Sequence, residues 1–237
     1  MDNAGFYILM ALVAAVGGGF VYLGWRAWRF YQLITETKTS KLQFVRQGLA
    51  EIQGKVVAAA DSVLESPYTL QKCVYYEFVV TEKRGKHTHT VVRDVQSVPC
   101  LVDDGTGQAE LPLGQATLVL NQDVRGRTGF FGSESPELER ALSERYQRST
   151  QGVFFSKSMS YRETALAVGD EVYVLGWVDK HEHTPRFTCN PVLLVSDKGE
   201  RHLTQRYLFQ AVACGIVVLV ALVAEALIVA GLLGVFR

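Results

Sequence analysis

Two adjacent aspartates, Asp103 and Asp104, are the side chains of this chain best placed for chemistry. They lie in the stretch CLVDDGTGQAELP, and two neighbouring carboxylates can share a proton or work as an acid and a base. No partner acid, base or metal motif accompanies them, and Gly105 and Gly107 follow closely. Aspartates accept backbone hydrogen bonds in tight turns and glycine takes positive φ, so we interpret the stretch as a turn that holds two strands in register.

Two pairs of alternate histidines, His87 with His89 and His181 with His183, form the second group. Alternate residues of a strand share a face, so each pair presents two imidazoles that could bind a metal. A zinc site needs further ligands at suitable spacing, and neither pair has a convincing third one. The favoured interpretation is solvated histidines at hairpins, and no metal or other cofactor is expected.

Cysteine chemistry and nucleic-acid binding are not favoured either. Cys73 lies in an apolar run and Cys214 in a longer one, where thiols are typically buried and inert. No G-x-S-x-G elbow, Walker A loop or H-E-x-x-H motif occurs. The chain has 24 basic and 24 acidic residues, and this zero net charge removes the attraction on which nonspecific nucleic-acid binding depends.

An apolar segment lies near each end of the chain, at 5–25 and 208–236, and the groups just described, except Cys214, lie between them. About 20 apolar residues in a helix cross the hydrocarbon core of a membrane. We predict a transmembrane helix over each segment, the first one retained because its N-terminal flank lacks the cations of a signal peptide. Lysines and arginines follow the first segment and precede the second, so the positive-inside rule predicts a two-pass protein with a cytoplasmic middle region. In a prokaryote this membrane would be the bacterial inner membrane.

Glu225 lies near the middle of the second apolar segment. A bare carboxylate in hydrocarbon is costly, so this side chain should be protonated or paired. We favour an inter-helix hydrogen bond, while a proton or ion pathway and a side chain that snorkels to the interface stay open. Small residues in both segments predict close helix pairing or oligomerisation. They are Ala11, Ala15, Gly17, Gly18, Gly19, Ala211, Gly215, Gly231 and Gly234.

The middle of the chain has the pattern of a β domain. A juxtamembrane helix or stalk is predicted over 26–53 and the domain itself over 54–205. Short runs rich in β-branched and aromatic residues, separated by turn sequences, predict about seven strands and favour a small barrel of the OB type. The main runs are GKVVAAA, CVYYEFVVTEK, HTHTVVRDV, CLVDD, QAELP, ATLVL, DEVYVLGWV and PVLLVSD.

An insertion over 123–160 interrupts these strands. Within it, SPELERALSERY predicts an amphipathic helix with Ser135 as N-cap and Pro136 as its first residue. Aromatic pairs beside arginines flank this helix and suit either a buried connection or an interface with lipid headgroups or a partner. The interface candidates are Phe130, Phe131, Phe154, Phe155, Arg125 and Arg127. The predicted class is therefore α+β, with two transmembrane helices flanking a mainly β, OB-like barrel domain that holds one amphipathic helix.

Four ordered blocks resemble a known family. GLAEIQGKVVA, ESPYTLQKCVYYEFVV, VPCLVDDGTGQAEL and YRETALAVGDEVYVLG are similar to the GIDE domain, which lies between the two transmembrane helices of MULAN-type ubiquitin ligases. The resemblance implies a role in recognising a partner or substrate. Ubiquitin transfer in that family resides in a RING, whose zinc sites need C-x-x-C spacing. The four cysteines here, Cys73, Cys100, Cys189 and Cys214, contain no such spacing, so a RING-less, prokaryotic-type member is expected.

The predicted function is a membrane-anchored, non-catalytic interaction or scaffold module. Its expected partners are the lipid bilayer, further copies of the chain and a membrane protein, with no role for nucleic acid. Two alternatives stay open: a membrane-associated enzyme, either a ligase-like transferase or a hydrolase, and an oligomeric transport or channel component that uses Glu225. The mitochondrial relatives hold this domain in the intermembrane space, which leaves the opposite orientation open as well.

Overall fold

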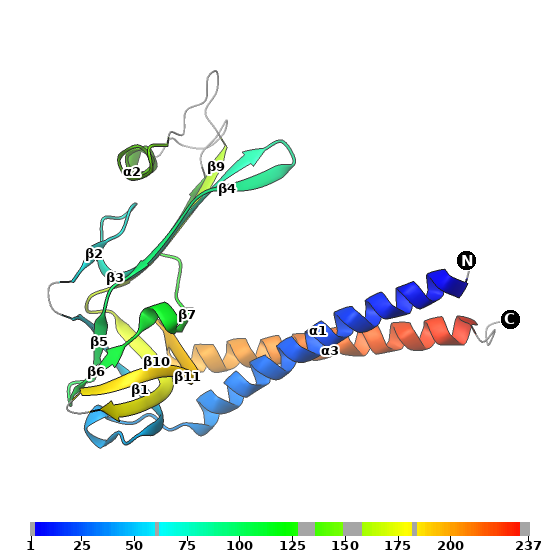
Figure 1. Ribbon diagram of the computed structural model, residues 1–237, viewed down its shortest axis with the longest axis horizontal. Coiled ribbons are helices and arrows are strands. Elements are labelled where there is room, and N and C mark those ends of the chain that lie inside the picture. The colour runs from blue at the N-terminus through cyan, green and yellow to red at the C-terminus, as the bar shows by residue number, and fades with distance from the viewer. Residues whose placement is uncertain (1–2, 60–61, 128–135, 149–157, 182–183, 233–237) are drawn as a thin grey trace. The chain divides into compact units, whose positions relative to one another are not determined.

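The computed structural model describes residues 3–59, 62–127, 136–148, 158–181 and 184–232. These residues form two compact units. One unit contains the two ends of the chain, up to Thr37 and from Glu200 onward, and the other contains Lys38–Gly199. Figure 1 labels the elements of both units, and each unit is described by itself.

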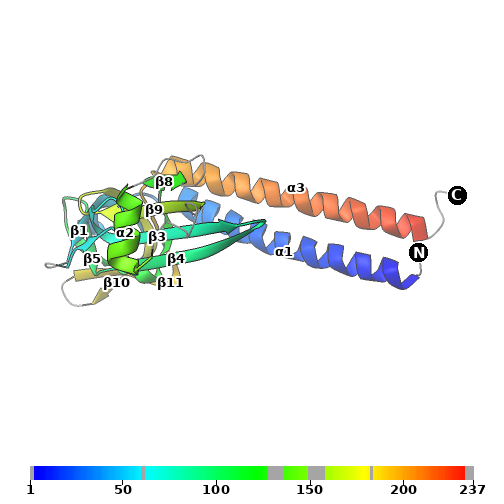
Figure 2. The ribbon, with the colours of Figure 1, turned by 90° about the horizontal axis from the view of Figure 1, so that it is seen from above.

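Two long helices make up the first unit, α1 (Asn3–Glu36) and α3 (Glu200–Leu232). Each is long and apolar enough to cross a membrane, which confirms the two predicted apolar helices. Figures 1 and 2 show them side by side, with the start of α1 and the end of α3 at the same end of the pair. Helix α1 continues beyond the predicted span 5–25 to Glu36, because no proline or glycine interrupts the polar residues that follow the span.

The two helices pack along a seam in which buried and half-buried residues alternate in steps of three and four, the spacing typical of left-handed helix pairs. A Cβ atom at Gly17 would lie 3.6 Å from the Ala221 Cβ, and one at Gly24 would lie 3.1 Å from the Cys214 Cβ. Small residues therefore allow the close approach that was predicted. The seam residues are Met10, Val13, Gly17, Phe20, Gly24, Ala27, Tyr31 and Ile34 on α1, and Tyr207, Ala211, Cys214, Val218, Ala221, Glu225 and Ile228 on α3.

Some of the predicted small residues do not lie in this seam. A Cβ atom at Gly18, Gly19 or Gly215 would meet nothing within 4 Å. The helical period explains this result, since only every third or fourth residue faces the other helix. Gly24, which the sequence interpretation missed, makes the closer of the two glycine contacts.

Five strands of the second unit close into a barrel, as predicted. The ring order is β10-β1-β5-β6-β11, and pairing of β10 with β11 closes it. Neighbours are antiparallel except β6 with β11, which are parallel. The strands are β1 (Gly48–Ala58), β5 (Cys100–Asp103), β6 (Gln108–Leu111), β10 (Glu171–His181) and β11 (Thr184–Ser196). Strand β1 thus begins before the predicted domain boundary at 54.

Alternating apolar residues fill the barrel. In the short strands β5 and β6 every second side chain is buried, so Val102 and Ala109 are fully enclosed. Two short 3-10 turns, η1 (Leu42–Phe44) and η2 (Leu113–Gln115), add Leu42 and Leu113 to the same core. Strand β7 (Thr117–Val119) pairs with β11 outside the ring.

The long hairpin expected among the barrel strands belongs instead to a second sheet. This sheet has the order β2-β3-β9-β8, with β4 paired along β3. Strand β3 pairs along its length with β4 on one side and with β9 on the other, so the hairpin lies outside the ring. The strands are β2 (Leu64–Glu65), β3 (Lys72–Arg84), β4 (His87–Ser97), β8 (Val124–Arg127) and β9 (Met159–Ala167).

Two insertions into the barrel build this second sheet. One carries β2, β3 and β4 between β1 and β5, and the other carries β8, α2 (Pro136–Tyr146) and β9 before β10. The amphipathic helix α2 buries Leu138 and Leu142 in a core shared with Phe78, and the Tyr146 ring stacks on Phe78 at 5.9 Å. The predicted N-cap Ser135 lies outside the described residues. Figure 1 shows α2 on one side of the sheet.

Candidate functional site

The aspartate stretch forms the turn between β5 and β6. The Gly105 N–H donates to Asp103 Oδ1 at 2.7 Å, and the Gln108 side-chain amide donates to Asp103 Oδ2 at 2.8 Å. Gly105 has a φ of +80°, a conformation that glycine adopts without strain. Both carboxylate oxygens of Asp103 are therefore occupied by donors from the turn itself.

Asp104 fastens a distant segment to this turn. Its Oδ2 accepts a hydrogen bond from the Leu42 N–H at 2.7 Å, and its Oδ1 accepts from the Thr106 N–H at 2.9 Å and the Thr106 hydroxyl at 2.7 Å. The Gln43 N–H then donates to the Thr106 hydroxyl at 3.3 Å. We call these four residues, Leu42, Gln43, Asp104 and Thr106, the clasp. Gly107 lies beside it, and a Cβ there would be in ordinary van der Waals contact with the Leu42 Cβ at 3.5 Å.

The hydrogen bonds of the turn favour its charged carboxylates. The amide of Gln108 and the Gly105 N–H lower the pKa of Asp103. Partial burial acts to raise the pKa of Asp104, but donors from Leu42 and Thr106 outweigh it and the pKa is lowered. Neither group has the raised pKa that a general acid at neutral pH would need. Their geometry is that of structural acceptors.

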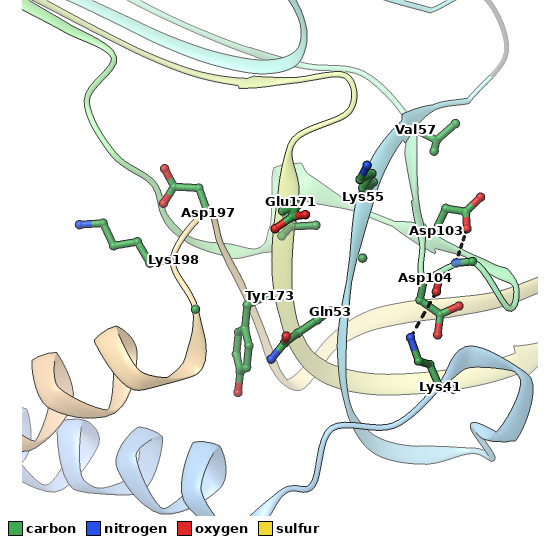
Figure 3. A pocket seen from close by; sticks show the side chains of 14 residues that line it. Lys41, Gln53, Lys55, Val57, Asp103, Asp104, Glu171, Tyr173, Asp197 and Lys198 are labelled. Atoms are coloured by element: carbon green, nitrogen blue, oxygen red, sulfur yellow. Dashed lines mark hydrogen bonds between the residues drawn. The ribbon is translucent and has the colours of Figure 1, made fainter.

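A pocket of about 710 Å³, lined by both charged and apolar residues, opens beside the clasp. Figure 3 shows Lys41 directed at Asp104 on one side and Asp197 with Lys198 on the other, with Glu171 and Lys55 between them. The Lys41 ammonium donates to the Asp104 carbonyl oxygen at 3.4 Å. In the strand register Lys55 lies between Glu171 and Asp103, so positive and negative groups alternate across the barrel surface.

Two further carboxylates lie near this surface. Glu51 is fully buried, and it accepts hydrogen bonds from the Tyr173 hydroxyl at 2.7 Å and from the Thr39 hydroxyl. Asp197 Oδ2 accepts from the Asn121 N–H at 2.7 Å, while its buried Oδ1 has no hydrogen-bond partner among the described residues. Sequence reasoning missed Glu51, since nothing in its own strand predicts partners that lie 12 and 122 residues away.

The histidines that the structure describes are not grouped as a metal centre. His87 and His89 are exposed near the β3–β4 turn, with ring centroids 6.4 Å apart. His181 ends β10, and His183 lies outside the described residues. Within the described part of the chain, no three His, Cys, Asp or Glu side chains are grouped as metal ligands.

Burial explains the inert cysteines. Cys73 and Cys100 are buried, and burial raises the pKa of Cys73 to about 11 and that of Cys100 to about 12. Both thiols therefore stay protonated at neutral pH, and a protonated thiol is a poor nucleophile. Cys214 is buried in the helix seam, and Cys189 is exposed.

The interface candidates are only partly described. Phe130, Phe131, Phe154 and Phe155 lie outside the described residues. Arg125 is exposed on β8, and Arg127 is the last residue of that strand. In the register of the sheet Arg125 lies directly opposite Arg162 of β9, a neighbour that sequence reasoning did not find.

Glu225 occupies a half-buried position in the helix seam. Ala221 lies against Gly17, so Glu225, four residues further along α3, is level with Val13, four residues back along α1. The facing stretch of α1, residues 9–17, reads LMALVAAVG and has no polar side chain. Among the described residues Glu225 has no hydrogen-bond or ion-pair partner, so the expected bond to the other helix of the same chain is not found there.

These features define a class of protein: a closed β-barrel with a second sheet, joined at both ends to helices long enough to span a membrane. The sequence pattern of the GIDE family, described as E3 ubiquitin ligase, matches residues 74–231. The match covers more than half of the chain, and the chain belongs to this family. No curated protein and no solved structure gives a significant match. The family relation supports a role related to that of E3 ubiquitin ligases.

Proposed function

We propose that this chain is a two-pass membrane protein that acts as an interaction module and assembles with further copies of itself through α3. The family match and the two apolar helices support its place in a membrane. The occupied oxygens of Asp103 and Asp104 support a structural role for the turn in place of catalysis. The mixed-charge pocket beside the clasp is then a surface for a protein partner.

The observation that carries self-assembly is the position of Glu225. A carboxyl group in hydrocarbon is stable only when it finds a polar partner. The facing surface of α1 is wholly apolar, and Glu225 is only half-buried by it. A second copy brings a second Glu225, and two carboxyl groups can exchange hydrogen bonds with each other across the interface. The Glu225 carboxyl group, which has no polar partner among the described residues of one chain, thus gains one in a dimer.

Residues near the C-terminal end of α1 support an orientation for the proposed membrane protein. The Arg29 guanidinium lies 5.1 Å from the ring centroid of Trp25, and the Arg26 guanidinium lies 6.0 Å from that of Phe30. Aromatic rings with cations are typical of the membrane interface. The cationic flanks of both spans support a cytoplasmic location for residues 38–199.

Native mass spectrometry of the full chain released from lipid nanodiscs tests self-assembly. We expect the wild type to give dimers or larger species and Glu225→Leu to give monomers, because leucine keeps the apolar volume and removes the polar contact. Glu225→Gln should retain most of the assembly, since an amide pairs with an amide. Leu219→Ala is the matched control: Leu219 lies on the same helix and is 62% exposed, and the change should not alter the mass of the assembly. Monomeric wild type would overturn the proposal.

A further inference from the structure

The second sheet has one face covered by α2 and an opposite face that carries a row of arginines. Residues directly opposite each other in a sheet share a face. The register aligns Arg125 of β8 with Arg162 of β9, Arg162 with Val79 of β3, and Val79 with Arg93 of β4. These three arginines, Arg125, Arg162 and Arg93, form what we call the arginine row. All three are exposed.

This arrangement is unfavourable for the isolated chain. Like charges directly opposite each other in a sheet are destabilising, and Arg125 and Arg162 have no hydrogen-bond or ion-pair partner among the described residues. Arg93 pairs with Glu77 at 3.2 Å, which is the one carboxylate that this face offers within the described strands. Glu163, the next acid along β9, is fully buried and accepts hydrogen bonds from Tyr68 and Thr69.

Lys83 adds a further cation to the same face. It follows Val79 by four residues on β3, so its side chain has the same orientation, and it is exposed. Among the residues whose side chains are described, this face therefore carries four cations and one acid, in a chain whose net charge is zero. Such a local excess indicates an anionic ligand.

We propose that the arginine row binds the phosphate groups of anionic lipid headgroups, an inference that rests on the membrane anchoring of the proposed function. Guanidinium groups bind phosphate through paired hydrogen bonds more specifically than ammonium groups do. Both ends of this unit continue directly into α1 and α3, so headgroups are present at high local concentration. The row matches a surface of headgroups by charge.

Single-stranded nucleic acid fits this face less well. It needs exposed aromatic rings on which bases can stack. The aromatic residue on this face, Tyr75, packs instead against the barrel core. Among the described residues of this face the charges therefore provide the binding surface, which favours the lipid phosphates.

Arginine labelling of the full chain in nanodiscs tests the inference. Phenylglyoxal modifies accessible guanidinium groups, and mass spectrometry measures the rate at each arginine. Discs of phosphatidylcholine alone are compared with discs that also contain phosphatidylglycerol. We expect Arg125 and Arg162 to react about fivefold more slowly in the anionic discs, the protection that corresponds to the attraction of one basic residue to an anionic surface. Arg186, exposed on the barrel and paired with Glu110, is the matched control and should react equally in both.

Two ligands added separately to the neutral discs distinguish lipid phosphates from other anions. Inorganic phosphate or a single-stranded oligonucleotide should protect the row less than phosphatidylglycerol does. Arg162→Gln should reduce the protection of Arg125 in anionic discs, because the row binds as a unit. Equal labelling of Arg125 and Arg162 in both kinds of disc would overturn the proposal, and so would stronger protection by the oligonucleotide. Either result leaves the oligomer measurement at Glu225 unaffected.

Discussion

The clasp and the helix seam each hold a carboxyl group in a partly buried site, Asp104 in the clasp and Glu225 in the seam. The two groups differ in their hydrogen-bond partners. Asp104 accepts three hydrogen bonds from its own chain, and its charge fastens one segment to another. Glu225 has no partner among the described residues and faces apolar side chains. A polar group that the chain itself satisfies serves the fold. One that has no partner among the described residues, like Glu225, Arg125 or Arg162, indicates a partner outside the chain.

Among the carboxylates whose hydrogen bonds come from the chain itself, Glu163 should cause the largest loss of stability when it is removed. This side chain is completely buried and accepts hydrogen bonds from the Tyr68 N–H, the Thr69 N–H and the Thr69 hydroxyl. Glu163→Ala leaves these donors without an acceptor, at a cost of about 3 kcal/mol in the free energy of unfolding. Urea unfolding of the full chain in detergent, followed by Trp177 fluorescence in a Trp25→Phe, Trp28→Phe background, measures the loss. Glu144→Ala, an exposed change on α2, is the control, and equal stability of the two variants would contradict the role of Glu163.

Asp104→Ala should destabilise the chain less, by about 2 kcal/mol. The change leaves the partly buried Leu42 N–H without an acceptor and releases the clasp. Asp104→Asn should cost about half as much, because the amide retains one acceptor oxygen. The same unfolding measurement applies, with oligomer size recorded alongside it. If Asp104→Ala changed oligomer size and left stability intact, Asp104 would serve contact between chains, as proposed for Glu225, and not the fold.

Acid should weaken the clasp in a predictable direction. The pKa values of Asp103 and Asp104 are lower in the folded chain than in the unfolded one, so their contribution is complete above the ordinary carboxyl pKa of about 4. It is lost as the pH falls through the lowered folded values. Unfolding free energies between about pH 5 and pH 2 should therefore fall less steeply in a chain with Asp103→Asn and Asp104→Asn. Parallel slopes for the two chains would show that these groups keep ordinary pKa values.

The smallest effect is expected at the arginine row. Arg125→Thr removes one of two opposed positive charges and places a good strand former on β8, so unfolding free energy should rise by about 0.3 kcal/mol. The same change should reduce the protection of Arg162 in anionic discs. A gain in stability together with a loss of lipid contact would show that this row serves a ligand outside the chain and not the fold. A clear loss of stability would show that Arg125 has a partner in the fold.

Local patterns in the sequence predicted the local features well. The apolar lengths predicted α1 and α3, the DDGTG sequence predicted the β5–β6 turn, and SPELERALSERY predicted α2. Strand-rich runs predicted the barrel. These features depend on residues close together in the chain, and hydrophobic period or turn chemistry records them directly.

Features that depend on distant partners were not predicted. The clasp joins Leu42 to Asp104 across 62 residues, and no pattern near either residue records the bond. The division of strands between barrel and second sheet depends on pairings between strands that lie far apart in the chain, such as β3 with β9. The arginine row appears only when β8, β9, β3 and β4 are placed in register. Glu225 was recognised as unusual from the sequence. Whether it has a partner on α1 could be seen only once the position of α1 against α3 was known.

The central claim is that Glu225 holds copies of this chain together in a membrane. Single-molecule photobleaching of the labelled full chain in vesicles, at low protein density, counts the copies in each complex. We predict two or more bleaching steps for the wild type and for Asp104→Ala, and a single step for Glu225→Leu. Equal step numbers for the wild type and Glu225→Leu would contradict the claim.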